Sequence, residues 1–248
     1  MWQHLQRSSQ SFLRGIVQLL YPSACLICDT QTPERPLCDT CESKLASDPV
    51  ERCPRCAYPV GSYSELEGGC NQCRGSFSFE TVVCLGSYEG LLRDVVLQCK
   101  RSSGESLAEI LGEHWAHCKL DELQSWHPDF IVPVPLHWWR RWRRGYNQSR
   151  ALAQSLSRIL NVPMIQCLRR IRPTASQARQ QITARRENVK GAFQAKSSPA
   201  IQGKRALLID DVLTSGSTAN EATKALRKAG VSSVMVGALA RAGGTSHE

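Results

Sequence analysis

The sequence predicts an α/β domain built on a mainly parallel sheet and preceded by a small cysteine-rich module. Three observations lead to this prediction. Eight of the twelve cysteines form four Cys-x-x-Cys pairs between residues 25 and 73. After Cys73, strand-like and helix-like segments alternate, as they do in right-handed βαβ units. One apolar strand then runs directly into two aspartates and a hydroxyl-rich loop, at the place where such sheets bind ligands.

Residues 1–22 are expected to form a short N-terminal helix. They carry one loose helical stripe of apolar side chains, namely Leu5, Phe12, Ile16 and Leu19. The apolar run at residues 16–21 is interrupted by Gln18 and is too short for a membrane span or a signal peptide. We therefore expect a docking helix without membrane insertion, in a protein that stays in the cytoplasm.

Residues 23–76 are expected to form a double zinc ribbon. The cytosol keeps thiols reduced, so metal binding is favoured over disulfides. Two Cys-x-x-Cys pairs supply the four thiolates of one closed tetrahedral shell, so four pairs predict two structural zinc ions. The expected ligands are Cys25, Cys28, Cys38, Cys41, Cys53, Cys56, Cys70 and Cys73. Spacing alone leaves open whether the pairs combine sequentially or in an interleaved order.

The cysteine-rich segment is rich in Pro and Gly and poor in long apolar runs, so zinc binding must supply much of its folding free energy. Four thiolates leave no open position for a substrate, which disfavours a catalytic zinc. A redox role for one pair is the weaker alternative. The isolated cysteines are expected to be buried in the α/β domain: Cys84, Cys99, Cys118 and Cys167.

Residues 80–245 are expected to form the α/β domain. Apolar and β-branched runs predict strands at residues 81–87, 130–134, 205–209 and 231–239, with a weaker one at 162–165. Apolar residues at helical spacing predict helices at residues 105–118, 149–160 and 218–229. Alternation of these elements predicts a mainly parallel sheet.

The most informative segment is residues 206–218, Ala-Leu-Leu-Ile-Asp-Asp-Val-Leu-Thr-Ser-Gly-Ser-Thr. The helix that begins there offers N–H groups and a positive dipole to a phosphate, and Gly216 lets the backbone approach it closely. Asp210 and Asp211 would repel the phosphate but can accept hydrogen bonds from ribose hydroxyls. A Walker A loop is excluded because its Gly-Lys-Ser/Thr sequence is absent. The segment predicts a phosphosugar site, and the alternative is a capped helix after a buried strand.

This segment resembles the phosphoribosyl pyrophosphate (PRPP) loop of type I phosphoribosyltransferases, in which an apolar strand, two acids and a Thr/Ser-Gly-x-Thr turn follow one another. The resemblance implies the type I phosphoribosyltransferase fold for the α/β domain. It also implies that Asp210 and Asp211 contact the ribose hydroxyls. The residues implied for the 5′-phosphate are Thr214, Ser215, Gly216, Ser217 and Thr218. Magnesium would enter together with PRPP, held mostly by the phosphates and the ribose.

Further motifs are spread along the chain. They are Tyr21-Pro-x-x-Cys25, Val132-Pro-Val-Pro135, Arg144-Gly-Tyr-Asn-Gln148, Ser176-Gln177, Arg186-Glu-Asn188, Gly191-Ala-Phe193 and Asp210-Asp-Val-Leu-Thr-Ser-Gly216. In this order they resemble the ComF/GntX family over nearly the whole chain. The resemblance implies a double zinc ribbon fused to a phosphoribosyltransferase-like domain, and a role in handling imported DNA for natural transformation or as a nutrient.

Two positions depart from the family pattern. Ser215 stands where a second Thr is commoner, which keeps a hydroxyl. Gln98-Cys-Lys100 stands where a Lys-Tyr pair is usual, which leaves the role of Lys100 open.

Positive charge is concentrated in residues 137–190, which carry thirteen Lys/Arg and one acid, a net of +12, whereas the whole chain carries +9. Arginine neutralises phosphate and aromatic rings stack on unpaired bases, so this region favours an anionic partner. The residues expected to contact single-stranded DNA or pyrophosphate are Trp138, Trp139, Arg140, Arg141, Arg143, Arg144, Tyr146 and Asn147. Packing of the tryptophans under the following helix is the third interpretation.

Three functions remain open at this point. The first is a DNA-handling factor that binds single strands and a phosphosugar, with a DNA-uptake or helicase-type protein as partner. The second is an active phosphoribosyltransferase, a glycosyltransferase in class, that transfers ribose 5-phosphate from PRPP to an unknown acceptor. The third is a non-catalytic adaptor that docks another protein through its zinc ribbons. No residue is assigned as catalytic, because no side chain is marked as an obligatory general base.

Overall fold

The computed structural model describes residues 24–32, 35–61, 69–73, 77–136, 144–172 and 189–243. The expected N-terminal helix of residues 1–22 lies outside these ranges. The chain divides into two compact units, residues 1–44 and residues 45–248. Residues 45–61 and 69–73 of the cysteine-rich segment therefore belong to the same unit as the α/β domain.

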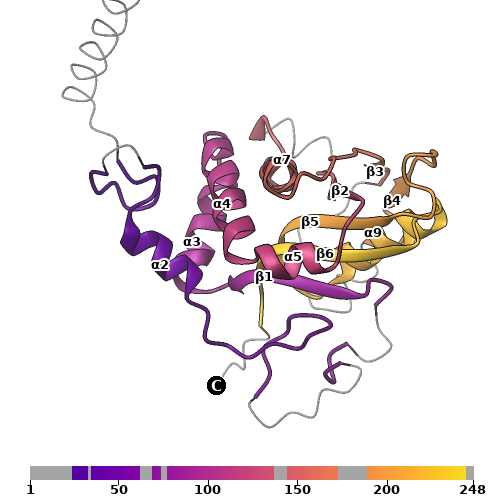
Figure 1. The fold of residues 1–248 in the computed structure, drawn as a ribbon, viewed down its shortest axis with the longest axis horizontal. Helices are drawn as coiled ribbons and strands as arrows, with labels where there is room; N and C mark the ends of the chain where they lie inside the picture. The colour runs from indigo at the N-terminus through magenta and orange to yellow at the C-terminus, as the bar shows by residue number, and fades with distance from the viewer. Residues whose placement is uncertain are drawn as a thin grey trace, which may run out of the picture. The chain divides into compact units, whose positions relative to one another are not determined.

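The second unit is built on a four-stranded, fully parallel sheet with the strand order β1-β6-β5-β2 (Figure 1). The strands are β1 (Thr81–Ser87), β2 (Phe130–Pro133), β5 (Arg205–Leu213) and β6 (Ser233–Arg241). Their apolar runs are almost continuous because both faces of the sheet are covered, which is the rule for parallel sheets. The predicted parallel α/β fold is confirmed.

Strand β5 is longer than the sequence predicted. It continues past Ile209 through both aspartates, because its partner β6 also continues and pairs Asp210 with Ala238 and Leu213 with Arg241. The acids therefore lie on the last part of the strand itself, at the carboxyl edge of the sheet.

The expected strand at residues 162–165 is reduced to a single parallel bridge between Ile131 and Met164. Pro163 has no N–H to donate, so a regular ladder cannot form through it. A separate antiparallel pair, β3 (Leu168–Arg170) and β4 (Phe193–Ala195), was not predicted. Each of these strands is only three residues long, which is too short for a periodic sequence signal.

Helices cover both faces of the sheet. They are α3 (Gly90–Gln98), α4 (Glu105–Cys118), α5 (Leu120–Ser125), α7 (Gln148–Leu160) and α9 (Ser217–Lys228). Alternate strand residues such as Val132, Leu208 and Val236 share one core with Ala219 and Leu226 of α9. Side chains of the opposite alternation face α4 and α7.

Close packing between this second face of the sheet and α4 explains why a glycine, Gly237, occurs in the inner strand β6. A Cβ at Gly237 would lie 2.8 Å from both the Trp115 indole of α4 and the side chain of Ile209. Gly112 of α4 is equally close to Ser155 of α7, where a Cβ would lie at 2.9 Å. The two helices therefore approach each other and the sheet at glycines, which brings the start of α7 near the carboxyl edge of the strands.

Three of the four isolated cysteines are buried as expected, Cys84, Cys99 and Cys167. Cys118 is exposed, which corrects the expectation. It is the last residue of α4, and the buried residues of that helix end at Ala116. Within the described ranges, the structure contains no helix with the length and apolarity needed to span a bilayer.

Candidate metal and phosphosugar sites

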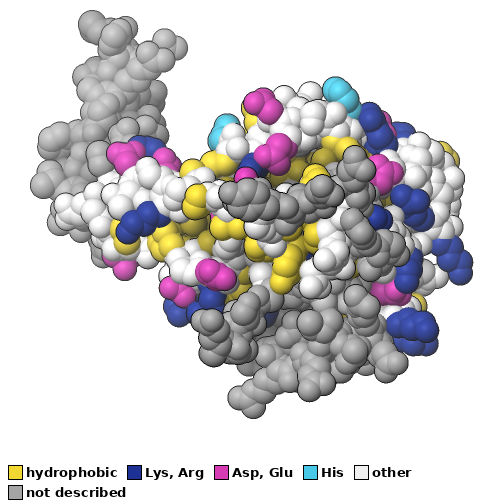
Figure 2. Space-filling model, turned by 90° about the horizontal axis from the view of Figure 1, so that it is seen from below, with side chains coloured by type: hydrophobic (Ala, Val, Ile, Leu, Met, Phe, Trp, Pro, Cys, Tyr) yellow, Lys and Arg dark blue, Asp and Glu magenta, His cyan; other side chains and the backbone are white. Residues whose placement is uncertain are grey.

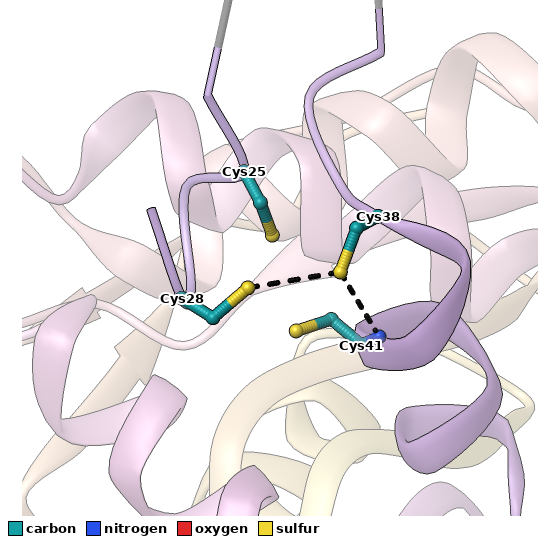
Figure 3. A group of neighbouring side chains, drawn as sticks. All are labelled: Cys25, Cys28, Cys38 and Cys41. Carbon is teal, nitrogen blue, oxygen red and sulfur yellow. Dashed lines mark hydrogen bonds between the residues drawn. The ribbon is translucent and has the colours of Figure 1, made fainter. Parts of the chain in front are cut away.

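The first cysteine cluster consists of Cys25, Cys28, Cys38 and Cys41, whose four sulfur atoms lie within 4.8 Å of one another and turn toward one point (Figure 3). The Sγ atoms of Cys28 and Cys38 are 3.7 Å apart. Tetrahedral zinc with Zn–S bonds of about 2.3 Å separates its sulfurs by about 3.8 Å. The backbone N–H of Cys41 also donates to the Cys38 sulfur at 3.4 Å.

The second cluster consists of Cys53, Cys56, Cys70 and Cys73, all of them buried. The Sγ–Sγ distances are 3.7 Å for Cys53–Cys73, 3.6 Å for Cys56–Cys70 and 3.9 Å for Cys70–Cys73. Burial opposes ionisation of Cys53, but backbone N–H groups, including that of Cys70 at 3.3 Å, lower its thiol pKa to about 7. Both clusters fit a closed four-thiolate zinc site.

These two clusters settle the pairing that spacing left open. The first two Cys-x-x-Cys pairs form one cluster and the last two form the other, so the pairing is sequential. All eight predicted ligands take part, and zinc bound in each cluster would hold together a segment that has few apolar side chains of its own.

The predicted phosphosugar residues lie together at the carboxyl edge of the sheet. Asp210 Oδ1 accepts hydrogen bonds from Ser149 Oγ at 3.2 Å and from the Asp211 N–H at 2.9 Å. Asp211 Oδ1 accepts from the Val212 N–H at 2.8 Å. Ser149 is in the first turn of α7, so the beginnings of α7 and α9 flank the two carboxylates. Ser149 was not predicted, because only the fold brings α7 to this edge.

Lys100 faces the same carboxylates. Its Nζ lies 3.1 Å from Asp211 Oδ2, and both side chains are largely buried. Burial alone would lower the pKa of Lys100, but the charge of Asp211 and the hydrogen bond to it raise that pKa above its usual value. The structure thus brings Lys100, whose role the sequence left open, into direct contact with the acid pair.

The hydroxyl-rich loop turns sharply into α9. Gly216 has φ of 73°, a left-handed conformation that residues with a Cβ rarely adopt, and a Cβ there would lie 2.8 Å from the Phe77 ring. Ser215 Oγ and Ser217 Oγ are 2.8 Å apart. Thr214 and Thr218 flank this turn. Because the start of a helix attracts anions, the turn can bind a phosphate beside carboxylates that can bind hydroxyls.

Burial and the adjacent charge of Asp211 raise the pKa of Asp210 to about 7. Ser149 and Lys100 oppose this rise. The pKa of Asp210 in the folded protein lies above the unfolded value of about 3.9. Ionisation of this carboxyl therefore lowers the free energy of unfolding as the pH rises from about 4 to 7. The acid pair is therefore a source of strain in the folded protein.

We predict that Asp210→Asn increases the free energy of unfolding at pH 8, on the order of 1–3 kcal/mol. The amide can still accept hydrogen bonds at Oδ1 but carries no charge. Urea unfolding of both proteins at pH 5 and pH 8 measures the effect, which should shrink at pH 5 because the wild-type carboxyl is then protonated. Equal stabilities at pH 8 would contradict the raised pKa.

The basic aromatic stretch is described only in part. Trp138, Trp139, Arg140, Arg141 and Arg143 lie outside the described residues. Tyr146 is only 6% exposed and its hydroxyl donates to the Cys99 carbonyl. Asn147 caps α7 by accepting from the Ser149 N–H and donates to the Val134 carbonyl at 3.0 Å. In the structure these two side chains hold α7 in place, and Arg144 follows the undescribed segment with partial exposure.

Comparison with known proteins agrees with this arrangement. Residues 16–74 match the model of the double zinc ribbon domain, and residues 106–247 match the model of the phosphoribosyl transferase domain. Competence protein F of Haemophilus influenzae is 34% identical over 216 residues, covering 83% of this chain and 90% of that protein. The chain belongs to the ComF/GntX family. DNA utilization protein YhgH of Escherichia coli K12 (32% identical) and competence protein ComFC of Bacillus subtilis (24%) match the same share of this ComF/GntX chain, with 90% and 89% of their own lengths covered.

Solved structures that resemble this ComF/GntX protein are more distant. One described as the allosteric regulatory enzyme of purine biosynthesis has a TM-score of 0.39 at 19% identity, and the match covers 58% of this chain and 30% of that one. Purine phosphoribosyltransferase from Pyrococcus horikoshii has a TM-score of 0.32 at 16% identity, with coverages of 60% and 73%.

Proposed function

We propose that this protein handles imported DNA and binds a phosphosugar of the PRPP type at the carboxyl edge of its sheet. The relatives named for competence and DNA utilization support the first part. One observation carries the second, the position of Asp210 and Asp211 at the end of β5, directly before the turn at Gly216 into α9. Carboxylates that can accept hydrogen bonds from sugar hydroxyls therefore lie directly before a helix start that can bind a phosphate.

In this proposal the two carboxylates accept hydrogen bonds from the ribose hydroxyls, and the turn of residues 214–218 binds the 5′-phosphate. Magnesium, when bound with PRPP, supplies charge neutralisation for the pyrophosphate, mainly through phosphate and water oxygens. Lys100 holds Asp211 through their ion pair and presents a positive charge beside the anionic ligand.

Binding of single-stranded DNA is assigned to the basic aromatic stretch of residues 137–148. Among the described surfaces, Figure 2 shows Lys and Arg side chains gathered at the end of the second unit that α9 and β4 form. Lys224 and Arg227 of α9 are paired there with Glu221 and Glu80, at 2.7 Å and 3.6 Å. The net charge of +12 over residues 137–190 favours the basic aromatic stretch as the DNA site. A DNA-uptake or helicase-type partner and a cytoplasmic location belong to the same proposal.

The intact acid pair and turn favour one second candidate, a phosphoribosyl transfer. In that reaction an acceptor nucleophile would form a bond to the anomeric carbon while the bond from that carbon to pyrophosphate breaks, and pyrophosphate would leave with the electron pair. A side chain that removes a proton from the acceptor is not assigned.

Calorimetric titration with PRPP and Mg²⁺ tests the phosphosugar site. We expect saturable binding by the wild type, weakened at least about tenfold in Asp210→Asn/Asp211→Asn, because two charge-assisted hydrogen bonds are lost. Asp129→Asn, which alters an exposed carboxylate near the amino end of β5, is the matched control. Absence of heat from the folded wild type would refute the site, and acceptor screening follows a positive result.

A further inference from the structure

A buried arginine connects two parts of the second unit. One is the second zinc ribbon, which contains the second cysteine cluster, and the other is the turn of residues 214–218, called the phosphate turn below. Arg241, the last residue of the central strand β6, is 4% exposed. Its Nε donates to the Cys56 carbonyl at 3.0 Å, and its terminal nitrogen donates to the carbonyls of Leu213 and Thr214, the first at 3.0 Å. Cys56 is a ligand in the second cluster, and Thr214 begins the phosphate turn.

Aromatic packing reinforces the same connection. The guanidinium lies 5.2 Å from the centre of the Tyr58 ring, and Tyr58 packs on the second cysteine cluster. Phe77 contacts that cluster, stacks on Phe79 at 4.6 Å, and limits the space at Gly216. The turn is therefore held from one side by groups whose own positions depend on the second cluster.

A comparable arginine lacks this connection. Arg52 donates to the ribbon carbonyl of Ala57 at 2.9 Å, but its other bonds go to Asp48 and to Ser87 of β1. It attaches the same ribbon to the sheet, and none of these bonds goes to the phosphate turn. Replacing Arg52 therefore disturbs only the attachment of the ribbon to the sheet. Replacing Arg241 also removes hydrogen bonds to the phosphate turn.

We propose that Arg241 is a positioning residue through which the second zinc ribbon, with residues Cys53–Cys73, holds the phosphate turn in its binding conformation. Removing metal from this ribbon would free the Cys56 carbonyl and Tyr58, and the turn would lose the arginine that holds the Leu213 and Thr214 carbonyls. The ligand side of this inference rests on the proposed PRPP site, whereas the coupling of ribbon to turn does not.

The first test is hydrogen–deuterium exchange of the amides of residues 214–220 in Arg241→Met, Arg241→Lys and Arg52→Met, each with its melting curve. We expect exchange at least about tenfold faster in Arg241→Met, an intermediate rate in Arg241→Lys, and a rate close to wild type in Arg52→Met. Equal rates in Arg241→Met and the wild type, or equal acceleration in both methionine variants, would overturn the proposal. Arg241→Lys keeps the test decisive if Arg241→Met fails to fold.

The second test removes metal from one ribbon at a time. Cys70→Ser/Cys73→Ser is expected to accelerate exchange in the turn, and Cys25→Ser/Cys28→Ser is not.

Titration with PRPP and Mg²⁺ is the third test. It should show about tenfold weaker binding for Arg241→Met and less than about twofold weaker binding for Arg52→Met. If the wild type binds no PRPP, the proposed function fails, yet the exchange data still decide the coupling. Unchanged amide exchange in the phosphate turn of Cys70→Ser/Cys73→Ser would refute the coupling of ribbon to turn.

Discussion

Removing zinc from the second ribbon is expected to lower the melting temperature of the α/β domain by about 5–10 °C. The reason is that contacts between ribbon and domain that contribute about a few kcal/mol to its stability are lost. Structural zinc contributes on the order of 10 kcal/mol to the folding of such modules, so Cys70→Ser/Cys73→Ser should unfold the ribbon itself. The α/β domain then loses the ribbon carbonyls that bind Arg241 and Thr81, and Ser87 of β1 loses its hydrogen bond from Arg52.

Metal analysis and differential scanning calorimetry of the purified protein measure this effect. We expect about two zinc ions per wild-type chain and about one in each double-serine variant. Cys25→Ser/Cys28→Ser is the matched control, because the first cluster lies in the other compact unit, and the main transition should stay within about 2 °C of wild type. A zinc content near zero in the wild type would refute both ribbons, and an unchanged transition after loss of the second would refute its structural role.

Replacing Trp138, Trp139, Arg143 and Arg144 together by Ala is expected to weaken binding of single-stranded DNA on the order of a hundredfold or more. Stacking of one base on an aromatic ring contributes about 1–3 kcal/mol, and each arginine that neutralises a phosphate adds to the salt dependence. Fluorescence anisotropy with a labelled oligonucleotide at several salt concentrations measures affinity and slope. The slope should fall in the variant, because fewer counterions are released.

A charge-matched control separates this stretch from general basicity. Lys224→Ala/Arg227→Ala removes two positive charges from α9, as many as the quadruple variant loses at Arg143 and Arg144. It should change the affinity less than about threefold, because both of these cations are already paired. Wild-type affinity in the quadruple variant would remove the stretch as the DNA site. Equal losses in the two variants would indicate attraction to net charge alone.

Much of the fold could be predicted because its signals are local. Apolar runs and helical spacing predicted β1, β2, β5, β6, α4, α7 and α9, and the spacing of Cys-x-x-Cys pairs predicted both zinc sites. The acids and glycine of residues 210–216 predicted a ligand site, since a strand, two carboxylates and a sharp turn follow one another directly. In each of these cases the residues that act together lie no more than 20 positions apart in the chain.

Only the tertiary structure decided what depends on distant residues. The contacts of Lys100 with Asp211 and of Ser149 with Asp210 arise because α7 and the end of α3 meet at the carboxyl edge of the sheet. Sequential pairing of the cysteines likewise follows from the path of the chain. Arg241 and the Cys56 carbonyl are 185 residues apart. Their hydrogen bond depends on the strand order β1-β6-β5, which local sequence does not encode, because it is set by how the whole core packs.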